Sequence, residues 1–274
     1  MKTDLAFRYA NAETFLKMLE SQELWFTDLR NMNDWDEYSA GYRIAKNVII
    51  NEFPNHTQVL ENISRDRMRD NFMMLICSLT NDGDCLSMWR GYGDNGRGAA
   101  VGYSTFEIEN HHLFDRYLQK LSPIQGRAKF YPVIYSEEDF KEQIRSYEHR
   151  LFTLRDDTPQ HMVQDILLSR SSMFGDLLTK LCTLYKSDFF KDEREIRGFI
   201  EINDVVDPYN MGKRNTDFGD APYHKISSSF QGIPSIKEVV LGPLYEESDE
   251  YVRSKLDAVG LSDVDIKRSR GTYR

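Results

Sequence analysis

Segments with helical and with extended patterns follow one another in irregular order along this chain, which constrains the fold more than any other feature. The most apolar extended segment of the first half is Met73–Leu79, and Ile196–Ile202 lies beyond two long helical segments. Parallel α/β proteins alternate strands and helices regularly, whereas α+β proteins do not. The order therefore predicts an α+β fold, and we expect one domain over residues 1–274 with a helical insertion at about 138–185.

The individual elements follow from periodicity and from capping residues. Asn11 is a good N-cap, and apolar residues at helical spacing follow it. Pro159 suits the first turn of a long helix that ends near Tyr185. The other predicted helices are 38–50, 58–70, 86–92, 138–152 and 249–259. The predicted strands are 5–9, 24–28, 73–79, 99–103, 129–135, 237–241, 264–267 and one that carries Glu193 and ends near Ile202.

Composition and charge exclude several classes of protein. Hydrophobic residues make up 40% of the 274 residues, which is enough for a substantial core and argues against disorder. No apolar run approaches the length of a membrane span, and the first residues lack the apolar stretch of a signal peptide. We therefore expect a cytoplasmic protein without a membrane partner. The net charge of −9 argues against a broad phosphate-binding surface, although a local basic site remains open.

The cysteines and histidines do not form a metal-binding pattern. Cys77, Cys85 and Cys182 are odd in number and include no Cys-Xaa-Xaa-Cys pair, while the histidines are scattered apart from one adjacent pair. These spacings predict reduced thiols in or near the core, with no zinc site.

The segment Lys186–Ile202 carries the clearest candidates for chemistry. Glu193 and Glu195 are two residues apart in a predicted strand, so with Arg197 they would share one face. Two neighbouring carboxylates repel each other, a cost that functional sites often accept. The alternative, a solvated edge strand with ordinary surface charge, stays open from this segment alone.

Two further residues precede the glutamates in a suggestive order. Arg8 lies in the first predicted strand, and Ser78 lies at the end of the strand Met73–Leu79. The order of arginine, serine and Glu-Xaa-Glu resembles that of the ADP-ribosyltransferase superfamily, although Ser78 stands in Cys-Ser-Leu-Thr rather than in Ser-Thr-Ser. The resemblance implies a split antiparallel or mixed β-sheet core that binds NAD as a substrate in its cleft.

The same resemblance implies a role for each residue. Arg8 and Ser78 would hold NAD, and Glu195 would stabilise positive charge on the nicotinamide ribose. Glu193 would hold or deprotonate the acceptor. The chemistry is consistent with these roles. The planar guanidinium suits a pyrophosphate or a ribose diol, and a carboxylate favours an oxocarbenium-like sugar electrostatically.

A second resemblance covers nearly the whole chain. Its marks are the segment Leu24–Asp28, the turn Met32–Glu37, the box Ser87–Tyr92, and Lys186 ahead of Glu193–Arg197. They resemble an uncharacterised bacterial family, a domain of unknown function, with an Asn-Asp…Glu turn, a Met-Trp-Xaa-Xaa-Tyr box and a Glu-Xaa-Glu-Xaa-Arg strand. Trp35 and Asp36 stand where Pro-Phe is usual. Members often look like accessory or defence proteins, and the family resembles ADP-ribosyltransferases distantly.

The aromatic residues near these motifs allow two interpretations. Trp89 and Tyr92 follow the serine strand and adjoin a glycine-rich turn at residues 93–98, so they are candidates for an aromatic wall that binds the NAD ring systems. At helical spacing they are equally compatible with a core role. Phe189 and Phe190, just before the glutamates, are either a substrate-recognition loop or a hydrophobic anchor.

The sequence therefore predicts an NAD-dependent ADP-ribosyltransferase-like enzyme. The resemblance suggests a bacterial toxin or anti-phage effector, with a protein or nucleic acid as the acceptor and a neutralising partner. Two alternatives stay open. In the first, the acidic turn at Asn33, Asp34, Asp36 and Glu37 joins the glutamates in a magnesium-dependent nuclease. In the second, the fold is retained in a binding or sensor protein without catalysis.

Overall fold

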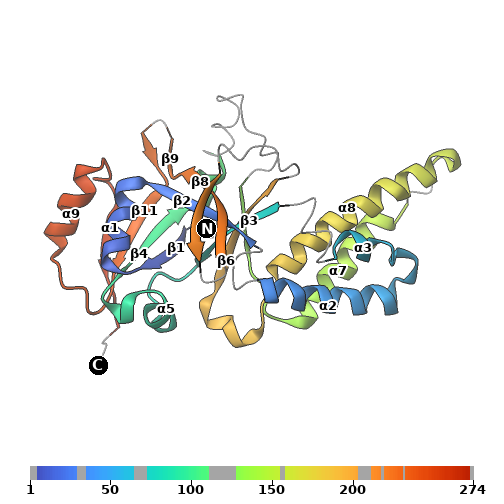
Figure 1. Ribbon diagram of the computed structural model, residues 1–274, viewed down its shortest axis with the longest axis horizontal. Coiled ribbons are helices and arrows are strands. Elements are labelled where there is room, and N and C mark those ends of the chain that lie inside the picture. Colours follow the sequence, from blue (N-terminus) through green and yellow to red (C-terminus); the bar gives the residue numbers. More distant parts are fainter. Residues whose placement is uncertain are drawn as a thin grey trace.

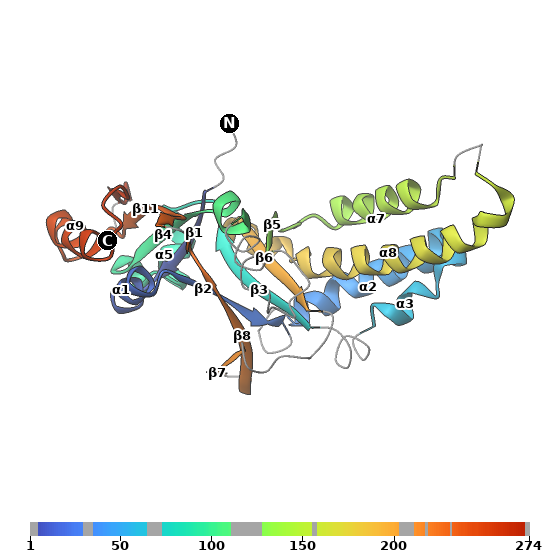
Figure 2. The same cartoon turned by 90° about the horizontal axis from the view of Figure 1, so that it is seen from above.

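A mixed β-sheet and a projecting arm of helices make up the fold (Figure 1). The computed structural model describes residues 5–29, 35–64, 73–110, 128–154, 158–202, 211–216, 219–230 and 232–271. Seen from above, the arm extends away from one end of the sheet (Figure 2). The predicted α+β class is confirmed.

The main sheet runs in the order β12-β11-β4-β1-β3-β2-β8-β7, with β6 paired to β3 and β5 paired to β6. Described neighbours are antiparallel except β11 and β12, which are parallel. A separate hairpin joins β9 (Ser229–Phe230) and β10 (Ile233–Pro234). The strands of the main sheet are β1 (Leu5–Ala10), β2 (Glu23–Asp28), β3 (Met73–Thr80), β4 (Ala99–Ser104), β5 (Lys129–Pro132), β6 (Glu195–Ile202), β7 (Gly212–Thr216), β8 (Gly219–Ser227), β11 (Ile236–Leu241) and β12 (Asp265–Arg268).

The sheet forks along one edge of β3. The other edge of β3 pairs with β6 from Met73 to Thr80. On the forked edge, β3 pairs with β2 at Leu75 and Ile76 and with β1 at Thr80. Between these contacts β1 and β2 separate from each other. The fork therefore lies beside Cys77–Leu79, so Ser78 stands where the sheet divides.

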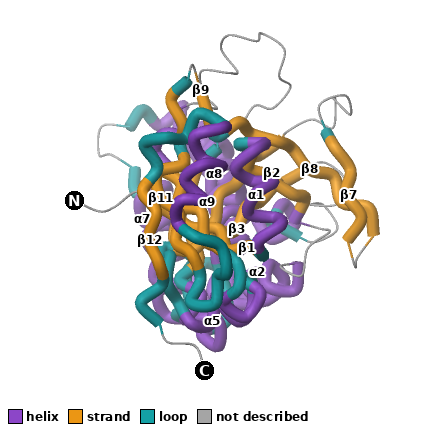
Figure 3. Tube along the Cα trace, turned by 90° about the vertical axis from the view of Figure 1, so that its left-hand side faces the viewer, coloured by secondary structure: helices purple, strands orange, loops and turns teal. Residues whose placement is uncertain are grey.

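Two layers cover the sheet. Helices α1 (Ala12–Ser21) and α9 (Asp249–Ala258) lie against one face, in front of the sheet in Figure 3. The predicted cap is confirmed, since Asn11 Oδ1 accepts a 2.8 Å hydrogen bond from the Thr14 amide. The short helix α5 (Leu86–Gly91) lies against the other face of β1, where Trp89 packs on Tyr9.

The arm is built around a hydrophobic cluster that includes Phe140, Phe174 and Leu178 and continues to Met74 and Phe199 of the sheet. The predicted insertion at 138–185 supplies only part of it, because two helices of the first half pack against it. Its elements are α2 (Trp35–Glu52), the 3-10 helix η2 (Pro54–His56), α3 (Val59–Asn62), α7 (Glu137–Phe152), the 3-10 helix η4 (Gln160–Met162) and α8 (Val163–Leu184).

Two predicted helix boundaries differ from the structure, and four strands were not predicted. Of the helix predicted at 58–70, the described part is the single turn α3, and residues 65–70 lie outside the described ones. The helix predicted from Pro159 begins as η4 and becomes α-helical at Val163. Strands β7 to β10 were not predicted, because β7 and β8 are largely polar and β9 and β10 are two residues long each. Among the described helices, α8 included, none is both long and apolar enough to span a lipid bilayer.

Candidate functional site

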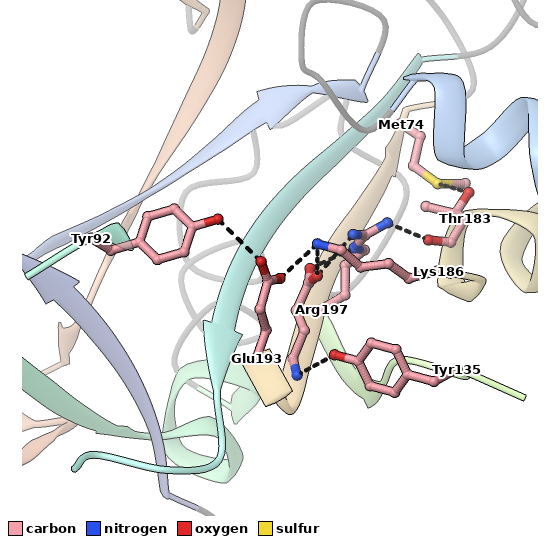
Figure 4. A network of polar contacts seen from close by, with 8 residues as sticks. Met74, Tyr92, Tyr135, Thr183, Lys186, Glu193 and Arg197 are labelled. Carbon is pink, nitrogen blue, oxygen red and sulfur yellow. Dashed lines mark hydrogen bonds and ion pairs between the residues drawn. The ribbon is translucent and has the colours of Figure 1, made fainter. Parts of the chain in front are cut away.

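A cluster of charged side chains lies where β3 ends and β6 begins, beside the fork. Ser78 stands opposite Arg197, and Thr80 stands opposite Glu195, in the antiparallel register of these strands. Directly opposed residues point to the same face of a sheet. Ser78, Glu195 and Arg197 are therefore neighbours, and with Lys186 and Glu193 they form what we call the Lys186 cluster. Figure 4 labels Lys186, Glu193 and Arg197 of this cluster.

Glu195 is the most constrained member of the Lys186 cluster. Arg197 donates from Nε to Oε1 at 2.7 Å and from Nη2 to Oε2 at 3.0 Å. Lys186 Nζ donates to Oε2 at 3.2 Å, and Ser78 also donates to this carboxylate. Burial alone raises the pKa of Glu195, but Arg197, Lys186 and Ser78 outweigh it, so the pKa lies below its usual value. Glu195 is therefore an ionised carboxylate with both oxygens occupied.

Arg197 connects the Lys186 cluster to the arm. Its guanidinium is fully buried and donates to the Thr183 carbonyl, near the end of α8, at 2.6 Å. The other end of the cluster is fixed by Tyr135, whose hydroxyl accepts the Glu195 amide at 2.8 Å. Burial raises the pKa of Tyr135 to about 12, although the hydrogen bond from that amide lowers it. The phenol therefore stays protonated at neutral pH.

Lys186 bridges the two glutamates. The residue follows α8, where its amide donates to the Ile134 carbonyl at 3.1 Å. Its Nζ donates to Glu193 Oε2 at 2.7 Å as well as to Glu195, and it lies 4.9 Å from the centre of the Phe190 ring. Lys186 is buried, so its charge requires these carboxylates. Two cations and two carboxylates thus make the Lys186 cluster neutral.

Glu193 reaches the cluster by a different path from the one predicted. It ends the 3-10 helix η5 (Asp188–Glu193), and Arg194, with φ +45°, separates it from the strand, which begins at Glu195. The prediction that Glu193 belongs to this strand is therefore wrong. Its side chain is 19% exposed against 4% for Glu195. Glu193 is accordingly the carboxylate nearer to solvent.

Comparison with known proteins gives a match to a family that covers most of the Lys186 cluster. Residues 88–198 match the model of a family described as protein of unknown function (DUF2971). The predicted resemblance to an uncharacterised family is confirmed over these residues. Neither the curated proteins nor the solved structures gave a match. The DUF2971 segment contains the Met-Trp box and the Glu-Xaa-Glu-Xaa-Arg motif, whereas Ser78 and the segments 24–28 and 32–37 precede it.

The DUF2971 segment brings one of its two predicted aromatic residues to the Lys186 cluster. The Tyr92 side chain is 55% exposed, and its hydroxyl lies 3.4 Å from Glu193 Oε1. Trp89 is buried, donates from Nε1 to Asp84 at 2.9 Å, and packs edge-to-face on Tyr9. Trp89 therefore supports α5, and the aromatic wall predicted from both residues is reduced to Tyr92.

The glycine-rich turn packs against the protein itself. A Cβ at Gly98 would lie 1.9 Å from the Ala10 carbonyl oxygen, and the Gly98 carbonyl accepts the Gly242 amide at 2.9 Å. Glycine is needed here because the turn joins the ends of three strands closely. Its backbone approaches β1 and β11 rather than a ligand.

Arg8 lies apart from the Lys186 cluster. Its Nη1 donates to Cys77 Sγ at 3.5 Å, and Cys77 packs in the core that α1 and α9 cover. Successive side chains of a strand point to opposite faces, so Cys77 points away from the face of Ser78. The structure thus brings Ser78, Glu193, Glu195 and Tyr92 together and leaves out Arg8.

Sequence reasoning assigned no role to Lys186 or Tyr135. A lysine seven residues before Glu193 was visible, but only the ends of α8 and β6 in space bring it between two carboxylates. The described residues contain no group of three or more His, Cys, Asp or Glu side chains that could hold a metal ion. The side chains of the predicted acidic turn, Asn33, Asp34, Asp36 and Glu37, lie outside the described ones.

Proposed function

We propose that this protein is an NAD-dependent ADP-ribosyltransferase-like enzyme with the Lys186 cluster as its catalytic site. The observation that supports the proposal most is the direct contact of Ser78 with Glu195, together with the link from Glu195 through Lys186 to Glu193. Two of the three motif positions that suggested NAD chemistry thus meet in one cluster. The proposed catalytic step uses neither Arg8 nor Trp89.

The different environments of the two glutamates suggest a separate role for each of them. Transfer breaks the bond between the ribose C1′ and the nicotinamide nitrogen, nicotinamide leaves with the bonding electrons, and positive charge develops on the sugar. A carboxylate beside the sugar favours that charge. A nucleophile of the acceptor then bonds to C1′ and releases its proton to water. Arg197 and Lys186 neutralise Glu195, while Glu193 has one cation and is more exposed. We assign Glu193 to the ribose, with Glu195 as a positioning residue.

The rim of the cluster supports binding of planar groups. Tyr92 lies next to Glu193 and Phe190 next to Lys186, and they are 55% and 38% exposed, while Phe189 is 83% exposed. Exposed aromatic side chains next to a charged site offer ring faces to a ligand. In this proposal Tyr92 borders the nicotinamide, and Phe189 contacts the acceptor.

The acceptor in this proposal is a protein or a nucleic acid, and the biological role is that of a toxin or anti-phage effector held in check by a neutralising partner. Toxicity gives a simple first test. Induced expression of the wild-type chain should arrest bacterial growth, and Glu193→Gln should relieve the arrest at equal protein level.

The decisive experiment incubates the purified protein with labelled NAD and a cell lysate. Label and nicotinamide are then measured in the protein, DNA, RNA and small-molecule fractions. We expect nicotinamide release that Glu193→Gln abolishes and that Glu246→Gln, an exposed control, leaves unchanged. Release of nicotinamide without transfer of label would indicate NAD hydrolysis at the same site.

Three outcomes would overturn the proposal. Nicotinamide release equal to that of the wild type in a folded Glu193→Gln variant would contradict the assignment of Glu193. Cleavage of nucleic acid that needs a divalent cation and no NAD would favour the nuclease alternative. No turnover of NAD or nucleic acid, in the presence of the lysate, would favour a binding or sensor protein.

A further inference from the structure

An open cavity of about 350 Å³ lies between the first turns of α8 and the residue before α3. We call it the arm-end cavity, because α8 begins at the end of the arm that is furthest from the sheet (Figure 2). The 22 residues of α8, roughly 30 Å of helix, separate this end from Lys186. The lining consists of Gln58, Gln160, Val163, Gln164, Leu167, Leu168 and Ser171.

The lining of the arm-end cavity carries no charge, since none of these seven residues is acidic or basic. Charged residues make up 29% of the chain, so the lining is an uncharged patch on a highly charged protein. The amides of Gln58, Gln160 and Gln164 each both donate and accept hydrogen bonds. The patch can therefore pair with a copy of itself, without the repulsion that charges of one sign would cause.

Leu168 is both part of the lining and a protruding apolar side chain. It is 60% exposed, against 50% for Met173 and 46% for Met162 of the same arm. In a two-fold symmetric dimer the same patch meets itself, so a side chain that enters the cavity of the partner is matched by the equivalent side chain of the partner. The patch thus holds a protruding apolar group beside a cavity that can receive one.

We propose that a second copy of this chain docks at the arm-end cavity, with Leu168 of each copy in the cavity of the other. Val163 and Leu167 contact the inserted leucine, and the glutamine amides form hydrogen bonds around it. Because the arm projects, docking at its outer end keeps the two sheets apart, so screening by salt limits the repulsion between copies that each carry a net charge of −9. A contact confined to the end of an arm is small, so we expect a reversible dimer.

The test measures the mass of the purified protein by sedimentation over a range of concentrations. The wild type should show a monomer–dimer equilibrium. Leu168→Asp should raise the dissociation constant at least about tenfold, because a carboxylate would enter the apolar cavity. Met173→Asp is the matched control, since it adds the same charge to the same helix at an exposed position outside the lining, and it should dimerise as the wild type does. Equal melting temperatures of the monomers verify that the variants fold.

Two further measurements test whether the same uncharged patch meets itself. Gln164→Glu and Gln164→Lys should each weaken the dimer, because like charges then meet across the two-fold axis, whereas an equimolar mixture of the two should restore association. Added salt should maintain or strengthen the wild-type dimer, since it screens the repulsion between copies and finds no ion pair to weaken at the interface.

The proposal does not depend on the proposed function, and Glu193→Gln should dimerise as the wild type does. A wild-type chain that stays monomeric would overturn the proposal and leave the arm-end cavity to a different protein. An unchanged dissociation constant in Leu168→Asp, an equal effect of Met173→Asp, or dissociation of the wild type by salt would also overturn it. Failure of the mixture of Gln164→Glu and Gln164→Lys to associate would contradict the two-fold contact.

Discussion

Ser78 on β3 and Arg197 on β6 stand opposite each other, and both donate hydrogen bonds to the carboxylate of Glu195. This relationship fixes the orientation of Glu195 from two strands at once. It also explains how a carboxylate with 4% exposure stays ionised, since cationic and hydroxyl donors replace the water that burial removes. The chemistry proposed for Glu193 depends on this fixed position of the Glu195 carboxylate.

The first prediction concerns the stability of the Lys186 cluster. Glu195→Gln leaves Arg197 without its carboxylate in a buried position, so the free energy of unfolding should fall by about 3–5 kcal/mol. Glu193→Gln should cost less, about 1 kcal/mol, because Glu193 is more exposed and Lys186 retains Glu195. Urea denaturation of both variants measures the difference. Equal losses would show that Glu195 does not anchor the cluster.

The second prediction concerns the effect of low pH on the stability that Glu195 contributes. The pKa of Glu195 is lowered in the folded protein, and an unfolded glutamate titrates near about 4.3. Its contribution to stability is therefore complete above that value and is lost as the pH falls through the lower, folded pKa. The gap in unfolding free energy between the wild type and Glu195→Gln should thus narrow below about pH 4. Urea titrations between about pH 3 and 7 test this, and a constant gap would contradict the lowered pKa.

The third prediction concerns Lys186 as the bridge between carboxylates. Lys186→Met should lower the free energy of unfolding by about 3 kcal/mol at pH 7, because two neighbouring carboxylates lose their shared cation. Adding Glu193→Gln to Lys186→Met should restore part of the stability, measured as a double-mutant cycle. Lys191→Met, on the exposed surface of η5, is the control.

The sequence indicated the sheet better than the site. The segments Met73–Leu79 and Leu24–Asp28 are β3 and β2 within one residue at each end. Met73–Leu79 was recognised because it is an almost continuous apolar run, and the structure packs its two faces into different hydrophobic clusters. The hairpin of β7 and β8 was missed because its residues are largely polar and its pairing is an interaction between strands, with little local signal.

Two structural features decide which residues belong to the Lys186 cluster, and the hydrophobic periodicity of the sequence indicates neither of them. Arg194 adopts positive φ, which is uncommon for a residue other than glycine, and this kink removes Glu193 from the strand while keeping it near Glu195. Lys186 enters the cluster because the end of α8 lies against β6. Similarly, the order of Arg8, Ser78 and Glu195 along the chain could not show that Arg8 points to the other face.

The last prediction concerns Asp84, which ties α5 to the C-terminal strand. Its carboxylate accepts hydrogen bonds from Trp89 Nε1 at 2.9 Å, from Ser269 Oγ at 2.5 Å and from the Arg270 amide at 2.8 Å. Burial raises the pKa of Asp84, but these three donors outweigh it and the pKa lies below the usual value. Asp84 is thus an ionised acceptor that holds the helix preceding Tyr92.

Asp84→Asn should loosen this connection, because an amide presents an N–H₂ donor where the carboxylate accepted. We expect faster hydrogen exchange in α5 and in residues 269–271, and a loss of about 1–2 kcal/mol in unfolding free energy. Exchange in α9, which Asp84 does not contact, should stay unchanged and serves as the internal control. If NAD turnover also falls while Glu193 is intact, the position of Tyr92 matters for activity. Unchanged exchange in α5 would show that packing of Trp89 on Tyr9 holds the helix without Asp84.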